Sequence, residues 1–302
     1  RRVADGDLFI VRNWKAADGV DAEGLVGQAF RQGAVAALVQ TGALPDSSNP
    51  LLEAPDPYTA LQAIAACANM KYAGLRILVT GSHGKTGFKT QLHHLIVKQI
   101  PAHANIDSGN KSAAIWRALA SIPERTRVMI VEVAVPSRSF AERGASLIRP
   151  DICVITGIGP EHLRSHKTMD NLIRNKAITV TGLRPGGKCL LNADDAYYPM
   201  LRSEVKNLSP CEILSFGSAP ECHGRLLEAR FDDLRWRTRA EILGEPVDYD
   251  LPLWEDYAPL ASVSALLAAK LVGTDLRACA AEYADYRNFE SSGNMYRIKT
   301  AK

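Results

Sequence analysis

The sequence of 302 residues lacks the features that mark several special classes of protein. No apolar run approaches the roughly 18 residues that a membrane-spanning helix needs, and no secretory signal is recognisable. We therefore expect no membrane partner and a cytoplasmic location. Dense Lys/Arg blocks interleaved with aromatic residues are also lacking, and the formal net charge is only +3, which argues against a nucleic-acid partner.

Paired cysteines are lacking too, since the six cysteines are scattered without a Cys-x-x-Cys motif. Cys211, Cys222 and His223 could be grouped into a zinc site, but their spacing matches no common one. Buried, reduced thiols are the simpler interpretation. With 46% apolar and 23% charged residues, the chain can bury a sizeable core without disulfides or structural metals.

Alternating strand and helix patterns predict an α/β fold in two parts. Residues 1–72 form a small N-terminal α/β domain, with a strand at 7–11, a helix at 21–32, a strand at 34–40, a loop at 42–57 and a helix at 58–69. Residues 73–302 form the second part. Its first half predicts a mainly parallel sheet with helices on both faces, from strands at 76–80, 127–133, 151–156, 188–191 and 212–216 and helices at 85–98, 111–121, 171–181 and 196–205.

The alternation of strands and helices ends after residue 216. Three hairpin-linked strands are expected at 225–231, 236–243 and 247–251, with turns at 232–233 and 244–246. They predict an antiparallel appendage to the sheet. Two helices, at 257–272 and 275–286, are expected to follow it.

The strongest functional signal lies where a predicted buried strand runs into Gly81-Ser82-His83-Gly84-Lys85-Thr86 and a helix begins. Glycines let backbone N–H groups turn toward phosphate oxygens, and the helix N-terminus adds partial positive charge. In such a P-loop, Lys85 reaches the β- and γ-phosphates and the Thr86 hydroxyl ligates magnesium. We therefore predict ATP and Mg²⁺ as cofactors. Because the loop is shorter than the usual form, a capped helix N-terminus with a solvated lysine is the alternative.

Residues 80–86 fit the pattern T-G-[TS]-x-G-K-[TS] and resemble the Mur ligase superfamily. Its members are ATP-dependent ligases that build peptidoglycan peptides, with relatives that extend folate polyglutamate and cyanophycin. The resemblance continues over nearly the whole chain. Residues 2–10 and 33–39 resemble the branch that adds the third residue or the D-Ala-D-Ala pair, and IGPEHL at 158–163 and LNADD at 191–195 resemble later family segments.

The resemblance implies an enzyme that forms amide bonds. A small-molecule or peptide carboxylate acceptor attacks the γ-phosphate of ATP and gives an acyl-phosphate and ADP. An amino-acid or amine donor then displaces phosphate. We expect Lys85 and magnesium to act by positioning and charge neutralisation.

The resemblance also assigns roles to residues outside the loop. Glu132 and His162 match metal-side ligands with Thr86, and Lys176 matches a lysine that many members carbamylate to hold a second magnesium. Asn192 and Asp194 match positions near adenine and ribose, and Asn105 matches a family segment between nucleotide and acceptor. Lys85, Lys176 and His162 are thus the expected catalytic residues. Glu132, His162 and Asn192 follow predicted strand ends, where ligands of open α/β sheets gather.

Each of these residues has a plain alternative role. Glu132 could end an exposed strand, and His162 could lie at a surface turn. Lys176 could be a solvated lysine in mid-helix, where i,i+4 partners are common. Asn192 and Asp194 suit an ordinary turn equally well.

The sequence also departs from the family pattern. Gly87 and Gly157 replace a hydroxyl residue and an Asn, Trp14-Lys15 replaces a glycine, Glu255-Asp256 replaces His-Asn, and Asn294 replaces an Arg after Gly293. The family's third, C-terminal domain is expected to be missing from this chain. It could have been removed, could be absent from the protein, or could be supplied by a partner chain. These departures favour a specialised biosynthetic pathway. The alternative functions are a non-catalytic nucleotide-binding or assembly module and, more remotely, a P-loop kinase.

Overall fold

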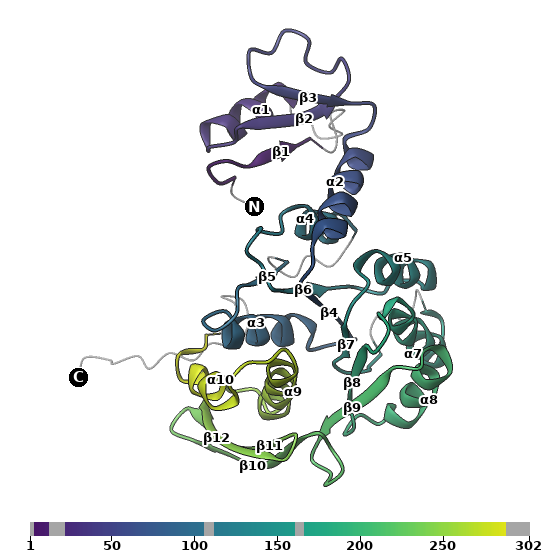
Figure 1. The fold of residues 1–302 in the computed structure, drawn as a ribbon, viewed down its shortest axis with the longest axis vertical. Coiled ribbons are helices and arrows are strands. Elements are labelled where there is room, and N and C mark those ends of the chain that lie inside the picture. The colour runs from purple at the N-terminus through teal and green to yellow at the C-terminus, as the bar shows by residue number, and fades with distance from the viewer. Residues whose placement is uncertain (1–2, 12–21, 106–111, 161–165, 288–302) are drawn as a thin grey trace, which may run out of the picture. The chain divides into compact units, whose positions relative to one another are not determined.

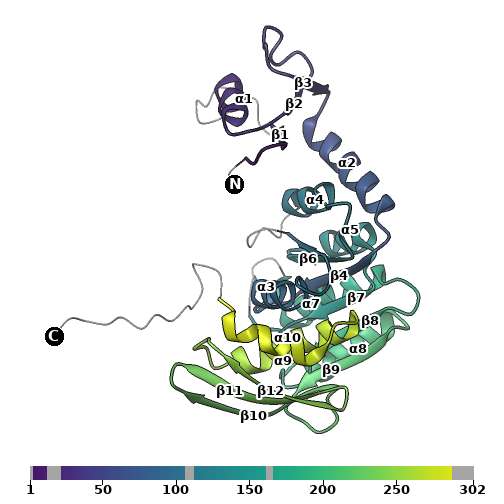
Figure 2. The same ribbon diagram turned by 60° about the vertical axis from the view of Figure 1, so that its left-hand side comes forward.

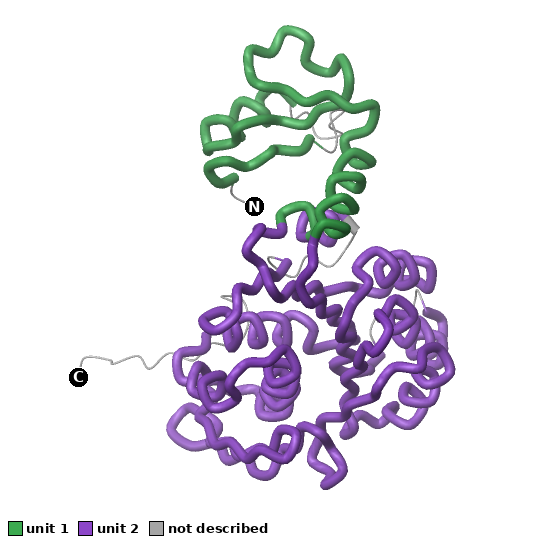
Figure 3. The backbone as a smooth tube through the Cα atoms, viewed as in Figure 1, with its two compact units in different colours: residues 1–71, 119–121 green, residues 72–118, 122–302 purple. Residues whose placement is uncertain are grey.

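The computed structural model describes residues 3–11, 22–105, 112–160 and 166–287. The chain divides into two compact units (Figure 3). Unit 1 comprises residues 1–71 and 119–121, and unit 2 comprises residues 72–118 and 122–302. Within the described residues, no helix is both long and apolar enough to cross a membrane.

Unit 1 holds a three-stranded parallel sheet in the order β1-β2-β3. The strands are β1 (Leu8–Ile10), β2 (Ala36–Gln40) and β3 (Leu51–Ala54), and the helices are α1 (Ala22–Arg31) and α2 (Pro57–Lys71). Strand β3 lies within the segment predicted as a loop, so that prediction is wrong for residues 51–54. Leu52 and Glu53 are exposed at the sheet edge, so no buried pattern marks the strand, and backbone pairing with β2 defines it.

Unit 2 is built on a nine-stranded sheet in the order β12-β11-β10-β9-β8-β7-β4-β6-β5. All neighbouring pairs from β5 to β10 are parallel, and the β10–β11 and β11–β12 pairs are antiparallel. This confirms the predicted α/β fold with a mainly parallel sheet and an antiparallel appendage. The strands are β4 (Leu75–Thr80), β5 (Ala102–Ala104), β6 (Val128–Glu132), β7 (Ile152–Ile155), β8 (Lys188–Asn192), β9 (Glu212–Gly217), β10 (Gly224–Asp232), β11 (Arg235–Ile242) and β12 (Glu245–Leu251).

Helices cover both faces of this sheet (Figures 1 and 2). One face carries α3 (Lys85–Ile96), α9 (Ala258–Leu271) and α10 (Leu276–Glu282), which pack on one another. The other carries α5 (Arg138–Ile148), α7 (Met169–Ala177) and α8 (Tyr198–Leu208), around the 3₁₀ turn η1 (Ile178–Gly182). The remaining elements of unit 2 are α4 (Ser112–Ala120), whose last residues belong to unit 1, and the 3₁₀ turn η2 (Tyr283–Asp285).

Two of these elements, α5 and β5, were not expected from the sequence. Helix α5 begins at the cap residue Ser137, whose side chain accepts a hydrogen bond from the Phe140 amide. Its buried face is made mainly of the small residues Ala141, Gly144 and Ala145, which do not stand out in the sequence as a stripe of large apolar side chains. Strand β5 has only three residues, too few to show a period.

The hairpin turns differ slightly from the prediction. The left-handed residues are Asp233 and Leu234 in the first turn and Leu243 and Gly244 in the second, as in two-residue type I′ turns. Glu245 and Pro246, predicted as turn, already belong to β12. Pro246 is accommodated there because β12 is the edge strand of the sheet.

All six cysteines are free thiols. Four are buried, but Cys67 on α2 is exposed, so the expectation of buried thiols is wrong for that residue. The grouping of Cys211, Cys222 and His223 finds no support as a metal site, because the described residues hold no cluster of three or more His, Cys, Asp or Glu suited to a metal. The ring of His223 instead accepts a hydrogen bond from the Ser215 amide at 3.1 Å.

Candidate functional site

The carboxyl ends of five parallel strands meet at one edge of the sheet in unit 2. The register places Val79 beside Glu132, Thr80 beside Ile155, and Asn192 beside Phe216. Strand β4 lies between β6 and β7, so the chain reverses its direction of winding there. Such a switch point is where open α/β sheets bind ligands, and the predicted P-loop follows β4 directly.

The loop has a positive-φ backbone conformation that its glycines permit. Gly81 has φ +148° and Gly84, the residue before α3, has φ +79°. A Cβ at Gly81 would lie 2.2 Å from the Thr156 hydroxyl, so only glycine fits. Among the described residues, no side chain caps α3. The amides of its first turn therefore open toward the loop, as at helix ends that bind anions.

The loop is tied to the segment after β7. The Ser82 amide donates to the Gly157 carbonyl at 2.7 Å, and its hydroxyl donates to the Gly159 carbonyl at 3.0 Å. Lys85 is nine-tenths buried, and its ammonium donates to the carbonyls of Gly81 at 2.9 Å and Ser82 at 2.7 Å. The cationic group thus lies inside the loop and not in solvent, in disagreement with the alternative of a solvated lysine.

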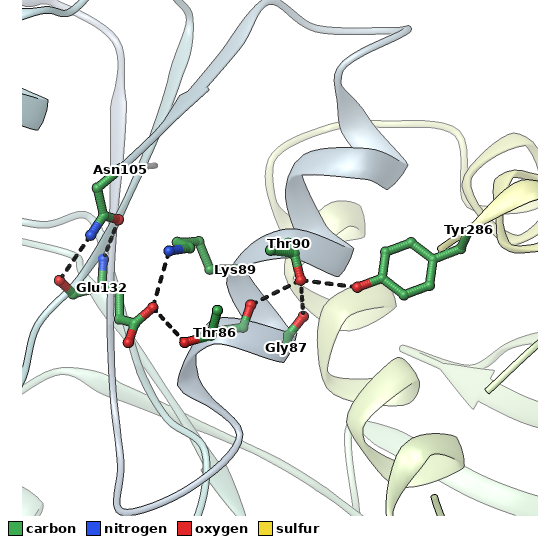
Figure 4. Close-up of polar contacts among 7 residues, drawn as sticks. All are labelled: Thr86, Gly87, Lys89, Thr90, Asn105, Glu132 and Tyr286. Carbon is green, nitrogen blue, oxygen red and sulfur yellow. Dashed lines mark hydrogen bonds and ion pairs between the residues drawn. The ribbon is translucent and has the colours of Figure 1, made fainter. Parts of the chain in front are cut away.

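Glu132 is fully buried at the end of β6, so the alternative of an exposed strand end is wrong. Its Oε2 accepts a hydrogen bond from the Thr86 hydroxyl at 2.9 Å and lies 3.0 Å from the ammonium of Lys89 (Figure 4). Asn105 braces the same strand end: its Oδ1 accepts from the Glu132 amide at 2.8 Å, and its Nδ2 donates to the Glu132 carbonyl at 3.3 Å. Lys89 was not singled out from the sequence, although it lies four residues, about one helical turn, beyond Lys85.

Thr86 and Glu132 fit a magnesium ion chemically. Magnesium takes oxygen ligands and usually keeps waters and phosphate oxygens in its shell, so one hydroxyl and one carboxylate suffice from the protein. The hydrogen bond between them already brings the two candidate ligand oxygens next to each other. The other expected metal ligand, His162, lies outside the described residues.

A pocket of about 200 Å³ opens beside the loop. It is lined by His83, Gly84, Phe88, Thr156, Asn192, Phe216, Tyr257, Leu260, Ala261 and Ser264. Aromatic and aliphatic side chains form most of the wall, with a few polar groups, as in pockets for flat organic ligands. Since His83 and Gly84 belong to both, a nucleotide with its phosphates on the loop would extend its base and sugar into this pocket. Phe216 and the α9 residues were not singled out from the sequence, because they carry no motif.

His83 is fitted to the glycine that replaces the family's asparagine. A Cβ at Gly157 would lie 2.6 Å from His83 Nε2, and one at Gly159 would lie 3.3 Å from His83 Nδ1. The ring therefore occupies the space that a larger residue at position 157 would need. The small residue at position 157 thus leaves room for the His83 ring in the pocket wall.

The structure places the remaining predicted residues in different surroundings. Asn192 lines the pocket, whereas the carboxylate of Asp194 turns to Ser218 and accepts hydrogen bonds from its amide and hydroxyl at 2.9–3.0 Å. Lys176 lies on α7, on the opposite sheet face from α3, and is only 3% exposed. A solvated lysine at this position is therefore excluded.

The sequence and the fold of this chain are similar to those of known proteins. The profile of the Mur ligase middle domain matches residues 79–240. A UDP-N-acetylmuramoyl-tripeptide–D-alanyl-D-alanine ligase of Bacillus subtilis is 27% identical over 221 residues, which are 72% of this chain and 46% of that protein. The enzyme of the same name from Rickettsia prowazekii is 22% identical over 99% of this chain and 66% of its own length. The chain thus spans about half to two-thirds of these relatives.

Solved structures share the fold. A crystal structure of MurF from Acinetobacter baumannii has a TM-score of 0.77 at 18% identity and covers 95% of this chain and 62% of its own. The MurF ligase of Thermotoga maritima in complex with ADP has a TM-score of 0.71 at 17% identity, covering 95% of this chain and 64% of its own. Because the middle-domain profile matches more than half of the 302 residues, the chain belongs to the Mur ligase family.

Proposed function

We propose that this chain is the nucleotide-binding part of an ATP-dependent carboxylate–amine ligase of Mur type. The observation that carries the proposal is the convergence of Lys85, the Thr86–Glu132 pair and a pocket of about 200 Å³ at the switch point of the sheet. The relatives' names suggest the first substrates to test: a UDP-N-acetylmuramoyl tripeptide as acceptor and D-alanyl-D-alanine as amine donor.

In this proposal the chain's residues act by position and charge. The pocket holds the base and sugar, the loop amides and Lys85 hold the phosphates, and Lys85 neutralises charge as the γ-phosphoryl group moves. An acceptor carboxylate oxygen bonds to the γ-phosphorus while ADP leaves, and an amine nitrogen then bonds to the acyl carbon while phosphate leaves. Magnesium, held by Thr86 and Glu132, would neutralise the phosphates.

Lys176 and His162 keep their proposed roles as a carbamylated second metal ligand and a metal-side ligand. Burial of Lys176 is compatible with modification, because carbamylation converts a costly buried ammonium into an anion that a metal can pair. Acid-labile CO₂ uptake by wild type but not by a Lys176→Ala variant would support that role.

Calorimetric titration of MgATP into the wild type, Lys85→Ala and the matched control Lys206→Ala tests the proposed site. Lys206 is exposed on α8, so its removal leaves the loop intact. We expect Lys85→Ala to bind MgATP at least about tenfold more weakly, because one charge-assisted contact contributes more than 1.4 kcal/mol. Equal binding by all three proteins would show that the loop is not the nucleotide site.

The reaction is tested separately, on the full-length protein with the two substrates named above. The proposal requires ADP and phosphate as products. Release of AMP and pyrophosphate contradicts it. Nucleotide binding without any product in an acceptor screen would favour the non-catalytic module instead.

A further inference from the structure

Lys89 is a second buried lysine on the loop-facing side of α3. Its ammonium lies 3.0 Å from Glu132 Oε2, and the two side chains are only 2% and 1% exposed (Figure 4). Because α3 turns once in about 3.6 residues, Lys89 and Lys85 lie on the same face of the helix. A lysine this deeply buried beside the metal-side carboxylate calls for a reason beyond surface charge.

Glu132 has a counter-cation without a metal. Its Oε2 receives both the Thr86 hydroxyl, at 2.9 Å, and the Lys89 ammonium. A divalent cation that approached this oxygen would therefore meet a cation already in contact with it. At such distances and in a buried environment, repulsion between like charges is strong.

We propose that Lys89 is the resident counter-cation of Glu132 and makes metal binding at this carboxylate depend on the nucleotide. The inference rests on the proposed nucleotide site. Without phosphates, Lys89 neutralises the only carboxylate that the described residues bring to Thr86, and a divalent ion gains little there. With phosphates, the added oxygens and negative charge outweigh the ammonium, and the ion enters together with the nucleotide.

A purely structural ion pair leads to a different expectation. It would support folding, and its removal would cost stability, since a buried charge left alone is destabilising. It would not cause a new affinity for metal to emerge when only the lysine is removed. Metal affinity in the absence of nucleotide therefore separates the two roles.

The test is a titration of Mn²⁺, followed by the electron paramagnetic resonance of the free ion, into nucleotide-free protein at constant pH. We expect Lys89→Gln to bind one Mn²⁺ at least about tenfold more tightly than the wild type, because the repelling charge is gone. Lys89→Arg keeps the charge and should bind as the wild type does. The double variant Lys89→Gln/Glu132→Gln should lose the gain, which locates the ion at Glu132.

Equal Mn²⁺ affinity of wild type and Lys89→Gln overturns the proposal, as does a gain that survives in the double variant. If Lys89→Gln does not fold, the wild type still decides the question. The Mn²⁺ affinity of the wild type should rise at least tenfold when ADP is added. Tight binding of Mn²⁺ by the nucleotide-free wild type would overturn the proposed role of Lys89. Failure of ADP to bind, with the Mn²⁺ results intact, would count against the proposed function and not against the counter-cation.

Discussion

At the scale of single residues, the loop at residues 81–86 depends on the lack of a side chain at Gly81. The Thr156 hydroxyl donates to the carbonyls of His83 at 2.5 Å and Thr80 at 3.2 Å, so it cannot move away from Gly81 without losing both bonds. The Thr156 hydroxyl, held by these two bonds, therefore fills the space that a Cβ at Gly81 would need. A positive φ adds a backbone penalty for any other residue.

Gly81→Ala should therefore lower MgADP affinity at least about tenfold and destabilise the protein by roughly 1–3 kcal/mol. Gly186→Ala is the matched control. Gly186 also has a positive φ, +77°, but a Cβ there meets no described atom within 4 Å. Urea unfolding and calorimetry on both variants separate backbone strain, which both share, from the steric clash. Unchanged MgADP affinity in Gly81→Ala would contradict the role assigned to Thr156.

At the scale of elements, α3 is held from two sides. On the side of β6, Thr86 and Lys89 contact Glu132. On the side of α10 and η2, the Thr90 hydroxyl hydrogen-bonds the Tyr286 hydroxyl at 2.9 Å, as Figure 4 shows, and the rings of His94 and Tyr286 meet edge to face at 5.2 Å. The helix that carries Lys85 is thus held between the central sheet and the last helical segment of the described chain.

Ionisation of Tyr286 should make the free energy of unfolding depend on pH. Burial raises the pKa of Tyr286 from 10.0 to about 12. Below pH 10 the phenol is protonated in both folded and unfolded chains. Between pH 10 and 12 mainly the unfolded chain releases the proton, so the free energy of unfolding falls with pH, by roughly 3 kcal/mol at most from this residue.

Tyr286→Phe should accordingly reduce the fall in unfolding free energy between pH 10 and 12 by about that amount. Near neutral pH it should cost roughly 0.5–1.5 kcal/mol, for the lost hydrogen bond to Thr90. Thr90→Val is the control, because it removes the same bond and keeps the titrating phenol. Urea titrations across this pH range check both effects. Parallel pH profiles for Tyr286→Phe and the wild type would contradict the prediction.

At the scale of the whole of unit 2, the antiparallel strands complete the core. Helix α9 contacts α3 and the strands β9, β10 and β11, and ten of its residues are buried. Figure 2 shows the hairpins curling beneath α9 and α10. The same helix contributes Leu260, Ala261 and Ser264 to the pocket, so the appendage supports the pocket wall through α9.

Leu267→Ala, at a fully buried position of α9, should cost about 2–5 kcal/mol of unfolding free energy through lost burial and the cavity left behind. Leu227→Ala on β10 is the control, since Leu227 is 39% exposed and its truncation should cost less than about 1 kcal/mol. Urea unfolding of the two variants measures the difference. Similar losses would show that α9 is not central to this core.

The amino-acid sequence alone determined the local features of this protein. The strand–Gly81-to-Thr86–helix unit was readable because its chemistry lies within one short segment. Most strands and helices were readable because burial repeats along them with a regular period. Strands β3 and β5 show no such repeat and were missed, as was α5, whose buried residues are mostly small. The turn at Leu243 was misplaced because a leucine rarely adopts a positive φ.

Only the tertiary structure decided which of these features meet. Thr86 and Glu132 are 46 residues apart, and their contact depends on the parallel register of β4 and β6. The burial of Lys89, the fit of His83 over Gly157 and the pocket wall from β9 and α9 likewise follow from strand order and helix packing. A local pattern carries no information on these partners, because the free energy that fixes them comes from burial against segments distant in the chain.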